Sequence, residues 1–208
     1  MKYISRTRFF ILTAILTLLF SFLAAYAKNV NRDLAGSMVR LHIIANSDSD
    51  ADQALKLRVR DRLLHDAAYI FEGSTSPADA LLAAKQNTEL IKQLAADEIS
   101  RQGYSYDVSV QVGKFAFPTK AYRDIMLPSG KYNAVRVVIG SGSGHNWWCV
   151  MYPPLCFTDG VVSVPDSARD KLRESLSESD YKLICGKDSG AVPVEVRFKI
   201  VELLQNIF

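Results

Sequence analysis

A basic and then strongly apolar N-terminus constrains this chain more than any other feature. Three basic residues precede an apolar run over residues 9–23, and Ala25 and Ala27 are small residues at the −3 and −1 positions of a cleavage site. This pattern predicts a signal peptide over residues 1–27 and a single extracytoplasmic domain over residues 28–208. The alternative is an uncleaved anchor, because the apolar run approaches the roughly 20 residues that span a bilayer.

The charge of the remaining chain is balanced. The full sequence has 25 basic and 22 acidic residues, and residues 1–27 contain three basic residues and no acidic one. A neutral domain lacks the positive field that nucleic acid requires, so we expect no nucleic-acid partner. No long run of basic residues indicates binding to anionic lipid, so we expect membrane contact only through the N-terminal segment or through a membrane-bound partner.

The first half of the domain predicts one strand and two long helices. Residues 38–45 are β-branched and bounded by polar residues, as in a strand. Apolar residues at helical spacing predict a helix over residues 50–71. Ser49 and Asp52 form a capping box at the start of this helix. Pro77 begins a second helix that runs to about residue 101. Because a short loop joins the two helices, they should pack antiparallel.

The periodicity then changes from helical to alternating. Residues 104–112 alternate apolar and polar side chains, and two further strands are expected over residues 132–140 and 146–152. Their short connections favour an antiparallel sheet. Shorter helices are expected over residues 165–176 and in the tail at 194–208. The fold class is therefore α+β, a mainly antiparallel sheet with two long antiparallel helices and shorter C-terminal helices packed on it.

The stretch GHNWWCVMYPPLCF at 144–157 raises the question of a cysteine active site. A thiolate nucleophile needs a base nearby. Four residues of extended strand separate His145 from Cys149, which corresponds to about 13 Å. The neighbours of Cys149 are apolar, and burial among them raises a thiol pKa and lowers its reactivity. We therefore expect no catalytic residue in this stretch.

Metal and cofactor motifs are also missing from the sequence. It has three scattered histidines and no C-x-x-C pair, which is a poor basis for zinc. The acidic stretch at 48–52 has Gln53 and Val59 where a calcium loop requires Gly and Glu. The stretch GSGSG at 140–144 lacks the lysine of a phosphate-binding loop. We expect no metal, no cofactor and no small-molecule substrate.

Three cysteines leave the disulfide state open. A bond between Cys149 and Cys156 requires the chain to turn back at Pro153 and Pro154, because a straight strand would hold the two about 23 Å apart and a disulfide spans at most about 7 Å. Cys185 is the alternative partner for either residue, and three unpaired thiols are the third arrangement.

Recognition of a partner remains as the function of the tryptophan-rich stretch. Adjacent residues of a strand point to opposite faces, so one of Trp147 and Trp148 can fill the core while the other faces outward. Tryptophan and tyrosine are enriched at the centres of protein interfaces. The expected contact patch comprises Asn146, Trp147, Trp148, Tyr152, Pro153 and Pro154. The alternative is that both rings cover the core.

Three segments resemble the stage II sporulation protein R family. They are VRLHIIANSDSDADQALKLRVRD at 39–61, NWWCVMYPPLCF at 146–157 and VRFKIVELLQ at 196–205. The motif residues present here are Arg40, Leu41, His42, Ala45, Asn46, Ser47, Asp48 and Ser49, then Asn146, Trp147, Trp148, Cys149, Pro153, Pro154 and Cys156. In physical terms Asn46, Ser47 and Ser49 can bond the backbone where the strand turns into the helix. His42 lies mid-strand, where a hydrogen-bonded core histidine is expected.

The resemblance implies a secreted signalling protein without enzymatic activity. Members of this family are made in the forespore and exported to the space between the forespore and mother-cell membranes. There they activate a membrane-embedded aspartic protease of the stage II sporulation protein GA type, which cleaves the precursor of sporulation sigma factor E. The alternative function is an extracytoplasmic hydrolase or a cell-wall-acting enzyme.

Overall fold

The computed structural model describes residues 6–122, 125–155 and 166–185. Its elements in chain order are α1 (Arg6–Gly36), β1 (Val39–Ile44), α2 (Asp50–Asp66), a 3-10 turn η1 (Ala68–Phe71), α3 (Pro77–Gln86), α4 (Thr88–Arg101), β2 (Val108–Phe117), β3 (Lys120–Tyr122), β4 (Ile125–Leu127), β5 (Gly130–Ile139), β6 (Asn146–Tyr152), α5 (Asp166–Glu174) and α6 (Glu178–Ile184). The α+β class is confirmed. The tail helix expected over residues 194–208 lies outside the described residues.

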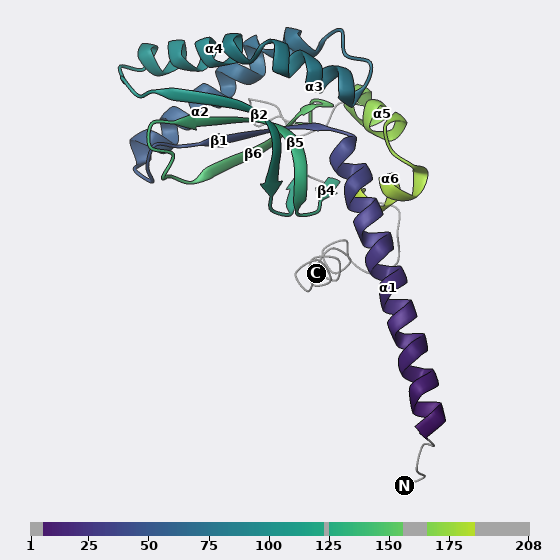
Figure 1. Cartoon of the computed structure of the whole chain (residues 1–208). Helices are drawn as coiled ribbons and strands as arrows, with labels where there is room; N and C mark the ends of the chain where they lie inside the picture. Colours follow the sequence, from purple (N-terminus) through teal and green to yellow (C-terminus); the bar gives the residue numbers. More distant parts are fainter. Residues whose placement is uncertain (1–5, 123–124, 156–165, 186–208) are drawn as a thin grey trace.

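A four-stranded sheet in the order β2-β5-β1-β6 forms the centre of the fold (Figure 1). β2 is antiparallel to β5 and β6 is antiparallel to β1, whereas β1 and β5 are parallel. The mainly antiparallel sheet is therefore confirmed, but β5 and β6 are not neighbours despite their short connection. β1 lies between them because its side chains are buried on both faces, as expected for a central strand.

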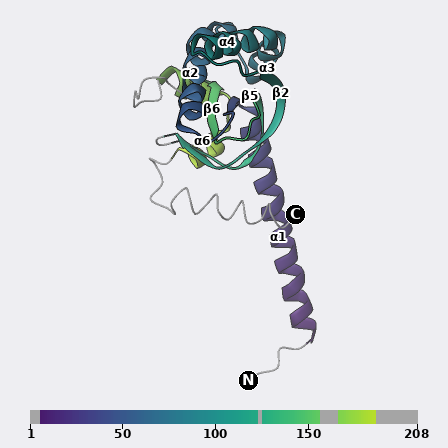
Figure 2. The same ribbon diagram turned by 90° about the vertical axis from the view of Figure 1, so that its left-hand side faces the viewer.

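Helices α2, α3 and α4 cover one face of the sheet (Figures 1 and 2). Their buried side chains pack against Leu41 and Ile43 of β1 and Val135 and Val137 of β5 in one hydrophobic core. α2 begins where its capping box predicts, because the Ser49 side chain accepts a hydrogen bond from the Asp52 backbone N–H. This layer fixes the position of the turn between β1 and α2.

The second long helix expected from Pro77 is two helices in the structure. α3 ends at Gln86, and α4 begins at Thr88. Asn87 Nδ2 donates to Ala83 O at 2.9 Å, and Thr88 Oγ1 donates to Lys85 O at 2.9 Å. Side chains that bond nearby carbonyls in this way compete with the backbone ladder, which explains the interruption.

The first strand of the second half also lies further along than expected. The alternation at residues 104–112 is real, but Tyr104 and Tyr106 precede β2 and stack on each other with ring centroids 5.4 Å apart. The small hairpin of β3 and β4 was not expected from the sequence, because each strand has only three residues. This hairpin brings Tyr122 against the sheet face that lies away from α2, α3 and α4, which we call the second face.

The end of the second face near Val39 has its own hydrophobic core. Leu34 of α1, Ile125 and Leu127 of β4, Leu172 of α5 and Ile184 of α6 are buried there. α1 continues past Ala27 and projects from the domain with large apolar side chains exposed (Figure 1). Among the residues that the structure describes, no helix is long and apolar enough to cross a membrane.

Candidate functional site

The two motifs that the sequence singled out lie side by side in the sheet. β1 carries the first and β6 the second, and their antiparallel register aligns His42 with Trp148 and Ile44 with Asn146. His42 Nε2 lies 2.7 Å from Asn146 Oδ1, although the residues are 104 positions apart in sequence. The motifs therefore form one structural unit.

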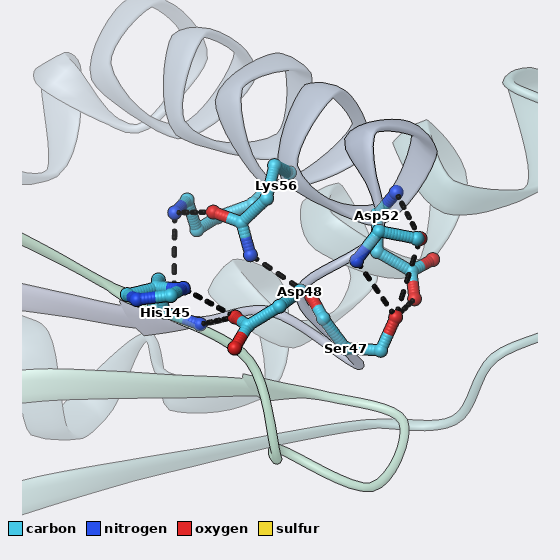
Figure 3. Close-up of polar contacts among 7 residues, drawn as sticks. Ser47, Asp48, Asp52, Lys56 and His145 are labelled. Carbon is cyan, nitrogen blue, oxygen red and sulfur yellow. Dashed lines mark hydrogen bonds and ion pairs between the residues drawn. The ribbon is translucent and has the colours of Figure 1, made fainter.

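A polar turn at residues 46–52 connects β1 to α2 (Figure 3). Asp52 is its centre and accepts hydrogen bonds from Ser47 Oγ at 2.5 Å and from Asn46 Nδ2 at 2.9 Å. These two bonds lower the pKa of the Asp52 carboxyl and outweigh its burial, which acts in the opposite direction. The side chains of Ser47 and Ser49 bond the backbone of the turn as expected, because they accept from Ser49 N and Asp52 N, and Asn46 Oδ1 accepts from Ser141 N of a distant loop.

The glycine-rich loop at 140–144 packs against this turn. Ser141 N donates to Asn46 Oδ1 at 3.0 Å, and Gly144 N donates to Ala45 O at 3.0 Å. Gly140 has a φ of +56°, and a Cβ on Gly144 would lie 2.2 Å from Ser47 O. These glycines are therefore required for close packing, because any side chain would collide with the turn.

His145 is directed toward Asp48 (Figure 3). Its backbone N–H donates to Asp48 Oδ1 at 2.6 Å, and its Nδ1 lies 2.5 Å from the same oxygen. Lys56, which is buried, donates from Nζ to His145 O at 3.0 Å and to Gln53 Oε1 at 2.5 Å. Burial lowers the pKa of the Lys56 amine. Sequence reasoning missed Lys56, which holds the start of β6 against α2.

Cys149 has no catalytic geometry. It is fully buried in the core beneath the helices and forms a disulfide, so it has no thiol proton to lose. The alternative pairing of Cys149 with Cys185 is wrong, because Cys185 keeps its thiol. Cys156, the other member of the predicted pair, lies outside the described residues, and that pairing stays a prediction. Within residues 6–122, 125–155 and 166–185, no three His, Cys, Asp or Glu side chains gather as a metal site.

The two tryptophans of β6 lie on opposite faces of the sheet, as expected, and both are half-buried. Trp147 faces the helices, where the Arg60 guanidinium carbon lies 4.4 Å from its ring centroid. Trp148 lies on the second face, stacked on His42 with ring centroids 3.7 Å apart and planes 19° apart. Each ring thus covers part of the core and keeps an accessible part.

Two residues of the expected contact patch are corrected by the structure. Tyr152 and Pro153 are buried, and Tyr152 OH donates to Ser74 O at 3.2 Å inside the core. They cannot frame an exposed patch. Asn146 and Pro154 are exposed, so the accessible part of the motif lies at both ends of β6.

Arg40 is the least expected side chain of the site. It is fully buried on the second face, and its guanidinium carbon lies 4.0 Å from the Phe117 ring centroid and 4.6 Å from that of Tyr132. Its Nη2 donates to Tyr122 OH at 2.8 Å, but Nε and Nη1 have no hydrogen-bond partner. No ion pair among the described residues involves Arg40. The sequence marked Arg40 as a motif residue and gave no signal of this environment.

His42 lies beside Arg40 in the same strand and is uncharged at neutral pH. Its burial lowers the pKa of the imidazole, and the nearby charges of Arg136 and Arg40 act in the same direction. The contact with Asn146 raises the pKa but does not compensate. His42 therefore serves as a neutral core histidine.

Comparisons of the sequence with known proteins agree with the resemblance that the motifs indicated. The family model of stage II sporulation protein R matches residues 35–162, which span β1 to β6. The chain is also similar to the stage II sporulation protein R of Bacillus subtilis (strain 168), with 40% identity over 181 residues, covering 82% of this chain and 81% of that protein. No solved structure matches. The resemblance seen in the motifs is thus confirmed, and the chain belongs to the stage II sporulation protein R family.

Proposed function

We propose that this protein is an exported, non-enzymatic signal that activates a membrane-embedded aspartic protease of the stage II sporulation protein GA type. Activation leads to cleavage of the sigma factor E precursor. The observation that carries the proposal is the family match, which spans both motif strands. The geometry is compatible with it, because residues of the two motifs hydrogen-bond one another across the sheet.

Activation by binding requires a difference in affinity between two states of the protease. A ligand that moves a receptor from 1:99 to 99:1 must favour the active state by about 5.5 kcal/mol. Buried tryptophan or arginine anchors at an interface contribute about 2 kcal/mol or more each. Two or three such side chains suffice when only the active state of the protease can accept them, and the accessible parts of Trp147 and Trp148 are the first candidates.

The test uses cells that produce the exported full-length chain, the protease and the sigma-factor precursor. Alanine at Trp148 should abolish precursor cleavage while export and folding persist. Tyr69→Ala is the matched control, because Tyr69 is an aromatic residue of η1 that is 54% exposed and outside both motifs. Full activity of both Trp147→Ala and Trp148→Ala would reject the site. Cleavage that persists in cells lacking the protease would favour the alternative, an extracytoplasmic hydrolase or a cell-wall-acting enzyme.

A further inference from the structure

At the Ile44 end, the second face of the sheet is open as far as the described residues show. The strand register aligns two rows of side chains across it: Gln111, Arg136, His42 and Trp148, then Ser109, Val138, Ile44 and Asn146. Of these, Ser109, Gln111 and Asn146 are exposed, and Ile44, Arg136, Val138 and Trp148 are half-buried. Figure 1 shows α1, α5 and α6 at the opposite end of the sheet, and no described helix covers these rows.

The strands at this end carry positive charge, and the acidic residues Asp107 and Asp48 lie in the connections at its edge. None of the four strands β1, β2, β5 and β6 contains Asp or Glu. Arg136 lies in the first row, and Arg40 lies behind it on the same face. Both guanidinium groups carry a positive charge. The face therefore complements an anion.

The guanidinium groups also have unused donors. Arg136 Nη2 donates to Gln111 Oε1 at 2.5 Å, and the guanidinium carbon lies 4.3 Å above the Phe115 ring centroid. Arg136 Nε, however, is buried and has no hydrogen-bond partner. The same is true of Nε and Nη1 of Arg40. Arg136 is half-buried, so a partner on this face can reach the accessible part of its guanidinium, whereas Arg40 is fully buried and contributes only positive charge behind it.

We propose that this face binds a carboxylate-bearing segment of the protease, with Arg136 as the charged contact and Trp148 beside it as the apolar contact. This inference rests on the proposed function. An arginine fork pairs with a carboxylate through two parallel hydrogen bonds, and the half-buried Val138 and Ile44 suit apolar side chains next to that carboxylate. A phosphate surface of lipid or nucleic acid would call for several exposed cations, and this face presents one accessible arginine.

Gln111→Glu gives the sharpest test. Its carboxylate would take the place of Gln111 Oε1 beside Arg136 Nη2 and neutralise the arginine from within the chain. The full-length chain and its variants are co-produced with the protease, and the protease is captured from detergent extracts while precursor cleavage is followed. We expect Q111E to fold as stably as the unaltered chain but to lower capture and cleavage at least fivefold. Arg136→Glu should lower both at least tenfold.

Lys114→Glu is the matched control for charge. Lys114 is an exposed residue of the same strand β2 but lies on the opposite face, so this variant should capture the protease within about twofold of the unaltered chain. Equal capture by Q111E, R136E and the unaltered chain would overturn the inference and leave the proposed function intact. If the unaltered chain neither captures nor activates the protease, the proposed function itself fails.

Two further outcomes would identify another occupant and overturn the inference. If R136E lowers the melting temperature of the isolated chain while the folded fraction still captures the protease, the complementary carboxylate belongs to this chain. If R136E dissociates a complex of two copies of the chain and leaves protease capture unchanged, the face joins two copies. If R136E fails to fold, Q111E still tests the inference, because this variant adds a partner for Arg136 and removes no contact of the core.

Discussion

Replacing Arg40 with methionine tests whether a buried charge is compensated within this chain. Arg40 is fully buried, and Nε and Nη1 of its guanidinium have no partner. Methionine has a similar length and no charge, so it can fill the space between Phe117 and Tyr132. Tyr122 OH would keep its hydrogen bond to Trp148 O, at 3.2 Å, and would not become unpaired. We predict that Arg40→Met leaves the free energy of unfolding nearly unchanged.

The magnitude follows from the contacts of Arg40. Each of its two unpaired nitrogens costs about 1–3 kcal/mol, or about 2–6 kcal/mol together. The charged hydrogen bond to Tyr122 contributes about 1.5–3 kcal/mol, and the contacts with the Phe117 and Tyr132 rings contribute about 1–2 kcal/mol each. The two sums nearly cancel, so the change should stay within about 2 kcal/mol. For a chain of this size that is a shift in melting temperature of about 4–8 °C or less.

Thermal unfolding of the purified chain by circular dichroism measures the effect, with urea unfolding as a second measure. Arg40→Ala is the matched control, because it leaves a cavity and should cost about 2–5 kcal/mol more than methionine. If R40M lowers the melting temperature by more than about 10 °C and Arg40→Lys restores most of it, a carboxylate of this chain pairs with Arg40. The charge would then be compensated within the chain, and the reasoning would be refuted.

Three further predictions concern the polar turn and His42. Gly144→Ala should destabilise the fold by about 1–3 kcal/mol, because the added Cβ would lie 2.2 Å from Ser47 O, and thermal unfolding measures this. Asp52→Ala should cost about 1–3 kcal/mol by leaving the donors of Ser47 and Asn46 unpaired, measured in the same way. The free energy of unfolding should reach its full value above about pH 6.5 and should decrease as the pH falls below 6.5. The cause is the lowered pKa of His42, because the unfolded chain binds the proton first, and urea unfolding across pH checks it.

Controls separate these effects from general sensitivity. Gly73→Ala should change stability by less than about 0.5 kcal/mol, because nothing lies within 4 Å of its added Cβ. Asp79→Ala, at the exposed start of α3, should cost less than D52A. His42→Gln should remove the decline in stability just below pH 6.5. A further decline below about pH 4 is expected in both proteins from the lowered pKa of Asp52. An unchanged slope in H42Q would contradict the assignment to His42.

The local features of the fold could be predicted from the sequence because short-range chemistry decides them. Ser49 with Asp52 begins α2, and Ser76 before Pro77 begins α3, as the capping patterns indicate. The strand expected over residues 146–152 is β6, and adjacent Trp147 and Trp148 lie on its opposite faces, as strand geometry predicts. The break at Asn87 was missed, because apolar spacing continues across it while two side-chain hydrogen bonds interrupt the helix.

The extent of the contact patch could not be predicted from residue type alone. Tyr152 was expected in an exposed contact patch, but its hydroxyl donates to Ser74 O within the core. Pro153 follows it into the interior. Burial of a polar aromatic residue depends on whether a distant carbonyl is in reach, and sequence spacing holds no information about that.

The α+β class, the family and the residues of the two motifs follow from the sequence alone. Each of these depends on the identity and spacing of residues along the chain. Only the tertiary structure decided that β1 lies between β5 and β6, so that His42 meets Trp148 and Asn146. The fold also places Arg40 and Arg136 on one face of a sheet whose four strands contain no Asp or Glu. The physical reason is that strand order and burial depend on contacts between residues far apart in sequence, which local patterns do not encode.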